Sequence, residues 1–90
     1  MERVVITVTG RDKVGIVAKI ASTLAENNVN ILDIRQSIME DLFTMIMLVD
    51  ISKSKSEFEE LIKELHAVGE EMGVKVIVQH ENIFKYMHRI

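Results

Sequence analysis

Apolar side chains along this chain alternate between two spacings, and the order of these spacings limits the folds that are open to it. A spacing of two residues is typical of a strand with one buried face, and a spacing of three or four residues is typical of a helix with one buried stripe. The spacings follow the order strand, helix, strand, strand, helix, strand. The predicted strands are residues 4–8, 30–39, 42–49 and 74–79, and the predicted helical stripes are residues 14–24 and 58–72.

This order predicts an α+β fold of the ferredoxin-like βαββαβ type, an antiparallel four-stranded sheet with two helices on one face. A chain of 90 residues forms one domain rather than two, and we expect that domain to span residues 1–80. Residues 81–90 are predicted to form a short amphipathic C-terminal tail, because Ile83, Met87 and Ile90 have the spacing of one helical face.

Short polar residues predict where the two helices begin and end. Asp12 or Lys13 is expected to open the first helix, and Asp12 is the better cap because its carboxylate accepts from unpaired backbone amides. Asn27 and Asn28 are expected to close that helix. The segment Ser56–Glu59 has the pattern of a capping box for the second helix, and Gly73 stands where that helix would end.

The third predicted strand, residues 42–49, is apolar on both of its faces. Phe43, Met45, Met47 and Val49 share one face, and Leu42, Ile46 and Leu48 share the other. One layer of helices covers only one face of a sheet, so the second face requires a further layer or a partner subunit. A homodimer is therefore expected, since a domain of this size has a thin core and gains from self-association.

The composition argues against several classes of function. The chain has no cysteine, which removes disulfides, thiolate metal sites and cysteine nucleophiles. Its formal net charge of −3 gives little attraction to a phosphate backbone, so we expect no nucleic-acid partner. No apolar run approaches the ~20 residues that span a bilayer. Because Met1 leads directly into a strand pattern and not into a signal sequence, we expect a cytoplasmic protein without a membrane partner.

The sequence contains no recognisable catalytic or metal-binding constellation. His66, His80 and His88 lack the i, i+3 or i+4 spacing that places two ligands on one helical face, and we interpret them as solvated or capping residues. Ser37 and Thr44 have no nearby histidine in sequence that could act as a base. We therefore do not expect an enzyme, and we predict no cofactor and no metal.

Residues 10–17, between the first strand and the first helix, have the features of a small-molecule site. Gly15 lets a ligand approach helix amides that are unpaired and lie at the positive end of the helix dipole. A ligand carboxylate could lie there, Asp12 could accept from an ammonium group, and Asn30 could both donate and accept. A free α-amino acid requires these groups. The residues also fit a structural interpretation, in which Gly15 allows tight helix–sheet packing, Asp12 caps the helix and Asn30 is a turn residue.

The same segments resemble the ACT domain, a small-molecule regulatory module attached to many enzymes of amino-acid metabolism. The resemblance covers roughly the first 80 residues through the βαββαβ order, and Asn30-Ile31 follows Gly15 at close to the family's spacing. The chain is also similar to stand-alone ACT proteins of bacteria and archaea, to glycine-cleavage repressor-like proteins and to the N-terminal domain of formyltetrahydrofolate deformylase. The matching residues are 4–10, 11–17 and 28–36.

The resemblance implies that two copies pair side by side into one sheet or stack sheet on sheet, with a ligand at the subunit interface. Carried over by position, the site consists of Asp12, Val14, Gly15 and Ile16 from one subunit and of Asn30 and Ile31 from its neighbour. Val14 stands where the family often has proline. Gly10 stands where some serine-sensing members have histidine, which argues against serine as the ligand.

Two functions remain open at this point. The first is a sensor or adaptor that binds a small molecule, an amino acid by its chemistry, and acts on a metabolic enzyme. The second is a protein–protein interaction module without a ligand, whose sheet face and tail dock a partner. The two differ in whether the segment around Gly15 binds a ligand.

Overall fold

The computed structural model describes residues 1–11 and 14–88, without the side chain of His88. Within these residues the chain forms four strands and three helices. Their bounds, in chain order, are β1 Arg3–Arg11, α1 Ile16–Glu26, β2 Asn30–Met39, β3 Leu42–Asp50, α2 Phe58–Met72, β4 Lys75–His80 and α3 Glu81–His88.

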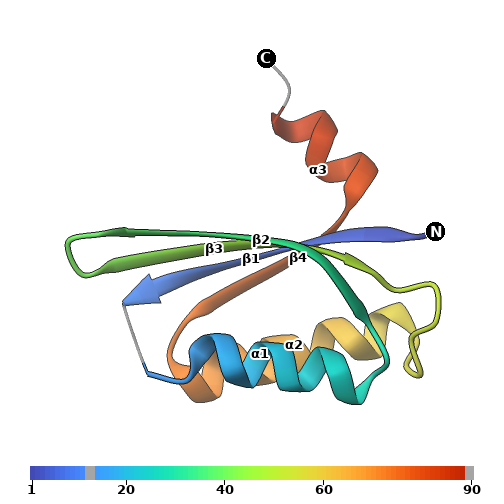
Figure 1. Cartoon of the computed structure of the whole chain (residues 1–90), viewed down its shortest axis with the longest axis horizontal. Helices are drawn as coiled ribbons and strands as arrows, with labels where there is room; N and C mark the ends of the chain where they lie inside the picture. The colour runs from blue at the N-terminus through green and yellow to red at the C-terminus, as the bar shows by residue number, and fades with distance from the viewer. Residues whose placement is uncertain (12–13, 89–90) are drawn as a thin grey trace.

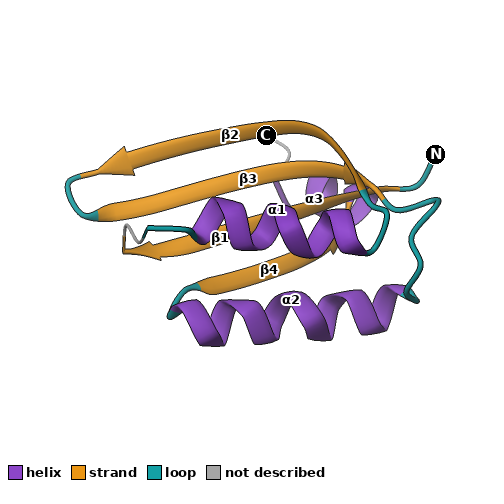
Figure 2. Cartoon of the chain, turned by 60° about the horizontal axis from the view of Figure 1, so that its bottom comes forward, coloured by secondary structure: helices purple, strands orange, loops and turns teal. Residues whose placement is uncertain are grey.

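The four strands form one antiparallel sheet in the order β2-β3-β1-β4. Helices α1 and α2 lie together on one face of this sheet, and α3 rises from the opposite face (Figures 1 and 2). The predicted ferredoxin-like βαββαβ fold is therefore confirmed. We call the face without α1 and α2 the open face. The edge strands are β2 and β4, since each has only one neighbour.

The hydrophobic core lies between the sheet and the two covering helices. Val4, Ile6 and Val8 of β1 alternate toward the helices and pair with Val49, Met47 and Met45 of β3. All six of these side chains are fully buried. The helices complete the core with their predicted apolar stripes, of which Ile20, Leu24, Leu61 and Leu65 are fully buried.

The second apolar face of β3 is only partly covered. Val5, which pairs with Leu48 of β3 on the open face, is buried, and α3 contacts β1 and β4 on that face. Ile46 lies further along the same face and remains 38% exposed. The expected second layer is thus a single short helix over part of the sheet, and a partner subunit on this face stays a prediction.

The structure corrects the predicted start of α1. This helix begins at Ile16, and its N-cap residue is Gly15, with φ of 88° and no side-chain cap. The prediction that Asp12 or Lys13 opens the helix was wrong, although both residues themselves lie outside the described ranges. Val14 was expected in the apolar stripe but precedes the helix and is fully exposed. At the other end, Asn28 has φ of 60°, the left-handed conformation expected there.

The predicted capping box of α2 was also wrong. The N-cap residue is Glu57, without a side-chain cap bond. The Ser56 hydroxyl donates instead to Oδ1 of Asn27, at the end of α1. A tertiary contact therefore competes with the local cap for the same hydroxyl group. The end of the helix is as predicted, with Gly73 in the left-handed conformation at φ of 73°.

The predicted tail is helix α3, which follows β4 without an intervening residue. Arg3 of β1 forms an ion pair of 2.9 Å with Glu81, and the Gln79 side-chain amide donates to the Met87 sulfur at 3.4 Å. The apolar stripe of the tail is nevertheless largely uncovered, since Ile83 and Met87 are 55% and 64% exposed. The third residue of that stripe, Ile90, lies outside the described ranges.

Candidate functional site

The connection between β1 and α1 contains two glycines with different roles. A Cβ atom at Gly10 would lie 2.8 Å from a methyl carbon of Val74, so close packing requires this glycine. Among the described residues, none would lie within 4 Å of a Cβ atom at Gly15 apart from its chain neighbours. The interpretation that Gly15 allows tight helix–sheet packing was therefore wrong. Its positive φ is the feature that favours glycine.

The side chains and the backbone of this connection differ in what they offer to a ligand. Val14 and Gly15 face solvent, whereas the Ile16 side chain is buried in the core. The first intrahelical bond runs from the Lys19 amide to the Gly15 carbonyl at 2.9 Å, so the amides of residues 16–18 lack helical partners. Ile16 can therefore reach a ligand only through its backbone N–H. Asp12 lies outside the described residues.

Asn30 and Ile31 lie at the opposite end of α1. Asn30 is exposed and pairs with Asp50 across β2 and β3, whereas Ile31 is partly buried and packs against the core. The 11 residues of α1 separate the Gly15 end from the Asn30 end, a distance of ~16 Å along the helix axis. One protomer therefore does not bring the two halves of the predicted site together.

The hydrogen-bond ladders show which backbone groups of the edge strands are turned outward. The Ile51 amide donates to the Glu2 carbonyl at 2.9 Å, so even-numbered residues of β1 bond to β3 and odd-numbered residues bond to β4. On β2, the same alternation turns the N–H and C=O groups of Gln36 and Ile38 toward the free edge. The Ile34 amide also faces outward, where the Asp33 carboxylate accepts its hydrogen bond at 2.9 Å.

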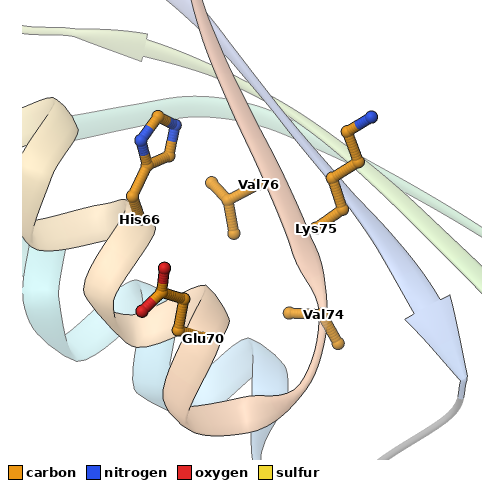
Figure 3. Close-up of a pocket in the computed structure, with 5 residues that line it drawn as sticks. All are labelled: His66, Glu70, Val74, Lys75 and Val76. Carbon is orange, nitrogen blue, oxygen red and sulfur yellow. The ribbon is translucent and has the colours of Figure 1, made fainter.

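A pocket of about 250 Å³ lies between α2 and the edge strand β4 (Figure 3). His66 and Glu70 line it from α2, and Val74, Lys75 and Val76 line it from the other side. The sequence pattern did not predict this pocket. The i, i+4 spacing of His66 and Glu70 was an available signal, but their closeness to β4 depends on tertiary packing.

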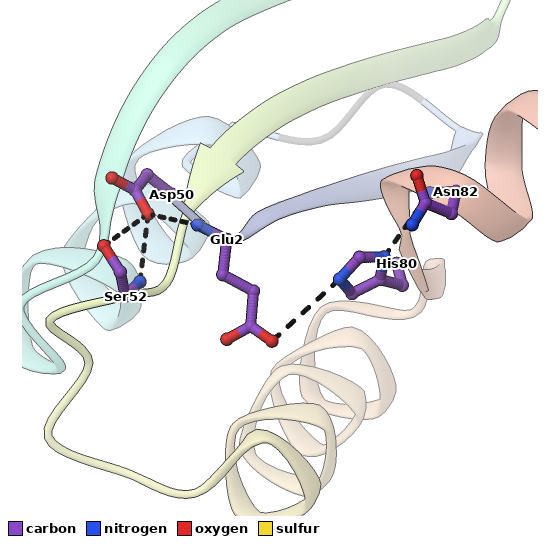
Figure 4. Close-up of polar contacts among 5 residues, drawn as sticks. All are labelled: Glu2, Asp50, Ser52, His80 and Asn82. Atoms are coloured by element: carbon purple, nitrogen blue, oxygen red, sulfur yellow. Dashed lines mark hydrogen bonds and ion pairs between the residues drawn. The ribbon is translucent and has the colours of Figure 1, made fainter.

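A polar cluster joins the starts of β1 and α3 (Figure 4). The Asp50 carboxylate accepts from the Ser52 hydroxyl at 2.7 Å, the Ser52 amide at 3.0 Å and the Glu2 amide at 3.3 Å. The hydrogen bonds from the Ser52 backbone and then from its side chain are the main causes that lower the pKa of Asp50. Because a lowered pKa makes the Asp50 carboxylate a weaker base, the Ser52 hydroxyl is not activated as a nucleophile by this contact.

His80 confirms the interpretation of a histidine as a capping residue. Its Nδ1 atom accepts from the Asn82 amide in the first turn of α3 at 3.4 Å, and its Nε2 atom lies 3.9 Å from the Glu2 carboxylate. Among the described residues, no three histidine, aspartate or glutamate side chains come together as a metal site would require. Over the same residues, no helix is both long enough and apolar enough to cross a membrane.

Comparisons with known proteins identify the family. A family model described as ACT domain matches residues 2–79. A UPF0237 protein of Methanococcus maripaludis is 69% identical over 90 residues, which cover 100% of both chains. The solved structure of an ACT domain protein from Streptococcus pneumoniae has a TM-score of 0.80 at 39% identity, over 93% of this chain and 94% of that chain. The chain therefore belongs to the ACT domain family and, within it, to the UPF0237 proteins.

More distant structures share this fold, and two of them confirm at the level of the fold the predicted relations to formyltetrahydrofolate deformylase and glycine-cleavage repressor-like proteins. A formyltetrahydrofolate deformylase from Burkholderia mallei has a TM-score of 0.80 at 12% identity, over 89% of this chain and 28% of that chain. A putative glycine cleavage system transcriptional repressor has a TM-score of 0.73 at 22% identity, over 87% and 44%. The regulatory subunit of aspartate kinase from Thermus thermophilus, in a ligand free form, has a TM-score of 0.66 at 26% identity, over 87% and 50%.

Proposed function

We propose that this protein is a regulatory sensor in which two copies pair through their β2 edges. An amino-acid-like ligand lies between the β1–α1 connection of one copy and the start of β2 of the other. The observation that carries this proposal is the position of the two half-sites at opposite ends of α1 in one protomer. ACT domains are typically regulatory modules that bind small molecules, and one similar structure is a regulatory subunit, which supports the same function.

Antiparallel pairing of two β2 strands supplies the missing half of the site. A two-fold axis reverses one copy relative to the other, so the start of β2 in one copy lies beside the end of β2 in the other. The end of β2 and the end of β1 share one end of the sheet, because Met39 and Arg11 both pair with Leu42. Asn30 of one copy thereby approaches the end of its partner that carries Gly15.

The groups in this arrangement match a zwitterion. The amides of residues 16–18, which lack helical partners, favour a carboxylate at the positive end of the helix dipole. This preference is worth ~0.3–1 kcal/mol at an exposed terminus and more where water is excluded. Asp12 provides the opposite charge for an ammonium group, and the Asn30 amide both donates and accepts. Val14 is the exposed apolar side chain that contacts the ligand's own side chain.

Isothermal titration calorimetry across the common amino acids tests this function. We expect one of them to bind, with Asp12→Ala weakening its affinity by ~1.5–3 kcal/mol, the range for a charged hydrogen bond. Asn30→Ala should weaken the same ligand. Asn82→Ala, a change to an exposed residue on α3, is the matched control and should bind as the wild type does. If the control weakens binding as much as Asn30→Ala does, the site lies elsewhere.

A second function has its own observation in its favour. The open face carries exposed Ile46 and Ile77, and α3 adds exposed Ile83, Tyr86 and Met87. An apolar surface of this kind fits an interaction module that docks a partner, such as a metabolic enzyme, without a ligand. The absence of calorimetric binding for every common amino acid would favour this second function over the first.

A further inference from the structure

The edge strand β4 presents backbone groups that have no strand partner in the part of the chain that the structure describes. By the alternation described above, Lys75, Ile77 and Gln79 bond to β1, which turns the N–H and C=O groups of Val76 and Val78 toward the free edge. The preceding residue supports this alternation, because the Val74 amide also points away from β1 and donates to the Gly69 carbonyl of α2 at 2.9 Å. A strand edge with such groups is a template for a further strand.

Helix α2 provides a packing surface beside this edge. It packs against β4 and runs alongside it at the border of the sheet (Figure 2). The pocket of about 250 Å³ lies where the two elements meet, with Val74 and Val76 as its apolar part and His66 and Glu70 as its polar part. A fifth strand laid against β4 would place alternate side chains over this pocket.

The side chains that line the pocket include one carboxylate, that of Glu70, and one ammonium group, that of Lys75. Glu70 lines the pocket from α2, whereas the Lys75 side chain extends to the other side of β4 (Figure 3). Among the described residues, no lysine, arginine or histidine nitrogen lies within 4.0 Å of the Glu70 carboxylate. Helix α2 as a whole carries five glutamates and one lysine. An incoming side chain of positive charge is therefore complementary to this edge.

We propose that the β4 edge binds an extended, basic segment of another polypeptide as a fifth strand, with an arginine or lysine side chain facing Glu70. Backbone hydrogen bonds to Val76 and Val78 supply the alignment, and the pocket selects the side chain. This site lies on the edge opposite to β2 and is complete within one protomer. It is therefore independent of the proposed amino-acid site.

The test uses two capped pentapeptides, acetyl-Val-Thr-Arg-Thr-Val-amide and the same peptide with glutamate in place of arginine, titrated into ¹⁵N-labelled protein. In an extended peptide the first, third and fifth side chains share one face, so arginine and both valines can face α2. We expect amide shifts at His66, Val76 and Val78 and weaker binding of the glutamate peptide. Shifts centred on residues 34–38 of β2, or no shifts with either peptide, would overturn the proposal.

Two matched pairs separate strand addition from nonspecific attraction. Glu70→Gln should weaken the arginine peptide ~2- to 5-fold, the range for an exposed ion pair. Glu60→Gln on the same helix should change nothing, because Glu60 lies one turn before Glu64, on the side of α2 that faces α1. A peptide N-methylated at arginine and one N-methylated at the following threonine should differ in affinity, since only alternate amides of a fifth strand point toward β4. Equal binding by these two peptides would exclude a fifth strand.

Discussion

The side-chain amide of Asn27 donates a hydrogen bond to the Glu64 carboxylate at 3.1 Å and so joins the end of α1 to the middle of α2. The same amide nitrogen donates to the Thr23 carbonyl at 2.9 Å, and its oxygen accepts from the Ser56 hydroxyl. The backbone carbonyl of Asn27 accepts from the Lys55 amide at 2.8 Å. One buried asparagine therefore connects both covering helices and the loop that precedes α2.

Replacing Asn27 with alanine should lower the free energy of unfolding by ~1–3 kcal/mol, because buried polar groups lose their partners. Urea unfolding monitored by circular dichroism measures this change. Ser56→Ala removes only one of these donors and should cost less, ~0.5–1.5 kcal/mol. An equal loss in the two variants would show that Asn27 contributes nothing beyond its contact with Ser56.

Gly15→Ala tests the role of backbone conformation at the start of α1. Within residues 1–11 and 14–88, no atom beyond the chain neighbours would crowd a Cβ at Gly15, so we expect the loss of stability to come from the positive φ, about 1–2 kcal/mol. Gly15→Asn is the matched control, since asparagine tolerates the left-handed region better, and it should lose less. The two midpoints of thermal unfolding provide the comparison. A larger loss for asparagine would indicate a steric rather than a conformational cause.

Gln36→Pro tests self-association through the β2 edge. The Gln36 N–H is turned outward and takes no part in the ladder with β3, so proline removes a group that is used only by a neighbouring copy. We expect the wild-type protein to dimerise in sedimentation equilibrium and this variant to associate at least ~10-fold more weakly. The reason is that hydrogen bonds and packing are lost on both sides of the two-fold axis.

Gln36→Ala is the control for that experiment because it keeps the backbone N–H. It should associate as the wild type does. A wild-type protein that stays monomeric at every concentration would contradict the dimer and the site that depends on it.

Asp50 is expected to make part of the stability of the fold depend on pH. Hydrogen bonds from Ser52, with a further one from the Glu2 amide, hold the pKa of Asp50 below its ordinary value of 3.8. A lowered pKa in the folded state means that this stabilisation is present above about pH 3.8 and is lost as the pH falls through the folded-state pKa. Between neutral and strongly acidic pH, the free energy of unfolding should therefore fall less steeply for Asp50→Asn than for the wild type. Parallel curves would disprove the assignment.

Removal of residues 81–90 tests what α3 contributes to the domain. The truncation uncovers Val5 on the open face and removes the ion pair between Arg3 and Glu81. We expect a loss of about 1–2 kcal/mol, mostly from the exposed valine. Glu81→Gln keeps α3 but removes the ion pairs of Glu81 with Arg3 and with Lys85, and it should cost no more than ~1 kcal/mol. An unchanged melting temperature after truncation would show that α3 leaves the sheet in solution.

The fold could be predicted because each segment buries one face whose spacing is visible in the sequence. The helix starts were predicted less accurately, because they depend on contacts between residues that are distant in sequence. Ser56 has a local use as a cap, but Asn27 lies close enough in the fold to take its hydroxyl hydrogen. Close packing requires Gly10 and not Gly15, since only the fold brings Val74 beside Gly10.

The predicted site follows the same rule. Its residues were chosen from two segments, and the sequence alone could not show that the segments lie at opposite ends of one helix. The pocket beside β4 was missed because the distance between α2 and an edge strand is a property of packing. Spacing identifies residues that share a face, but it does not identify which faces meet.

The position of Tyr86 has a consequence for spectroscopy. It is the only tyrosine of the chain, and there is no tryptophan, so the intrinsic near-ultraviolet emission has one main source. That source is on α3, which rises from the face of the sheet opposite to the helices (Figure 1). Tyrosine fluorescence therefore reports on the surroundings of α3. A titration that changes this emission records an event on the open face or a change transmitted there, without any introduced label.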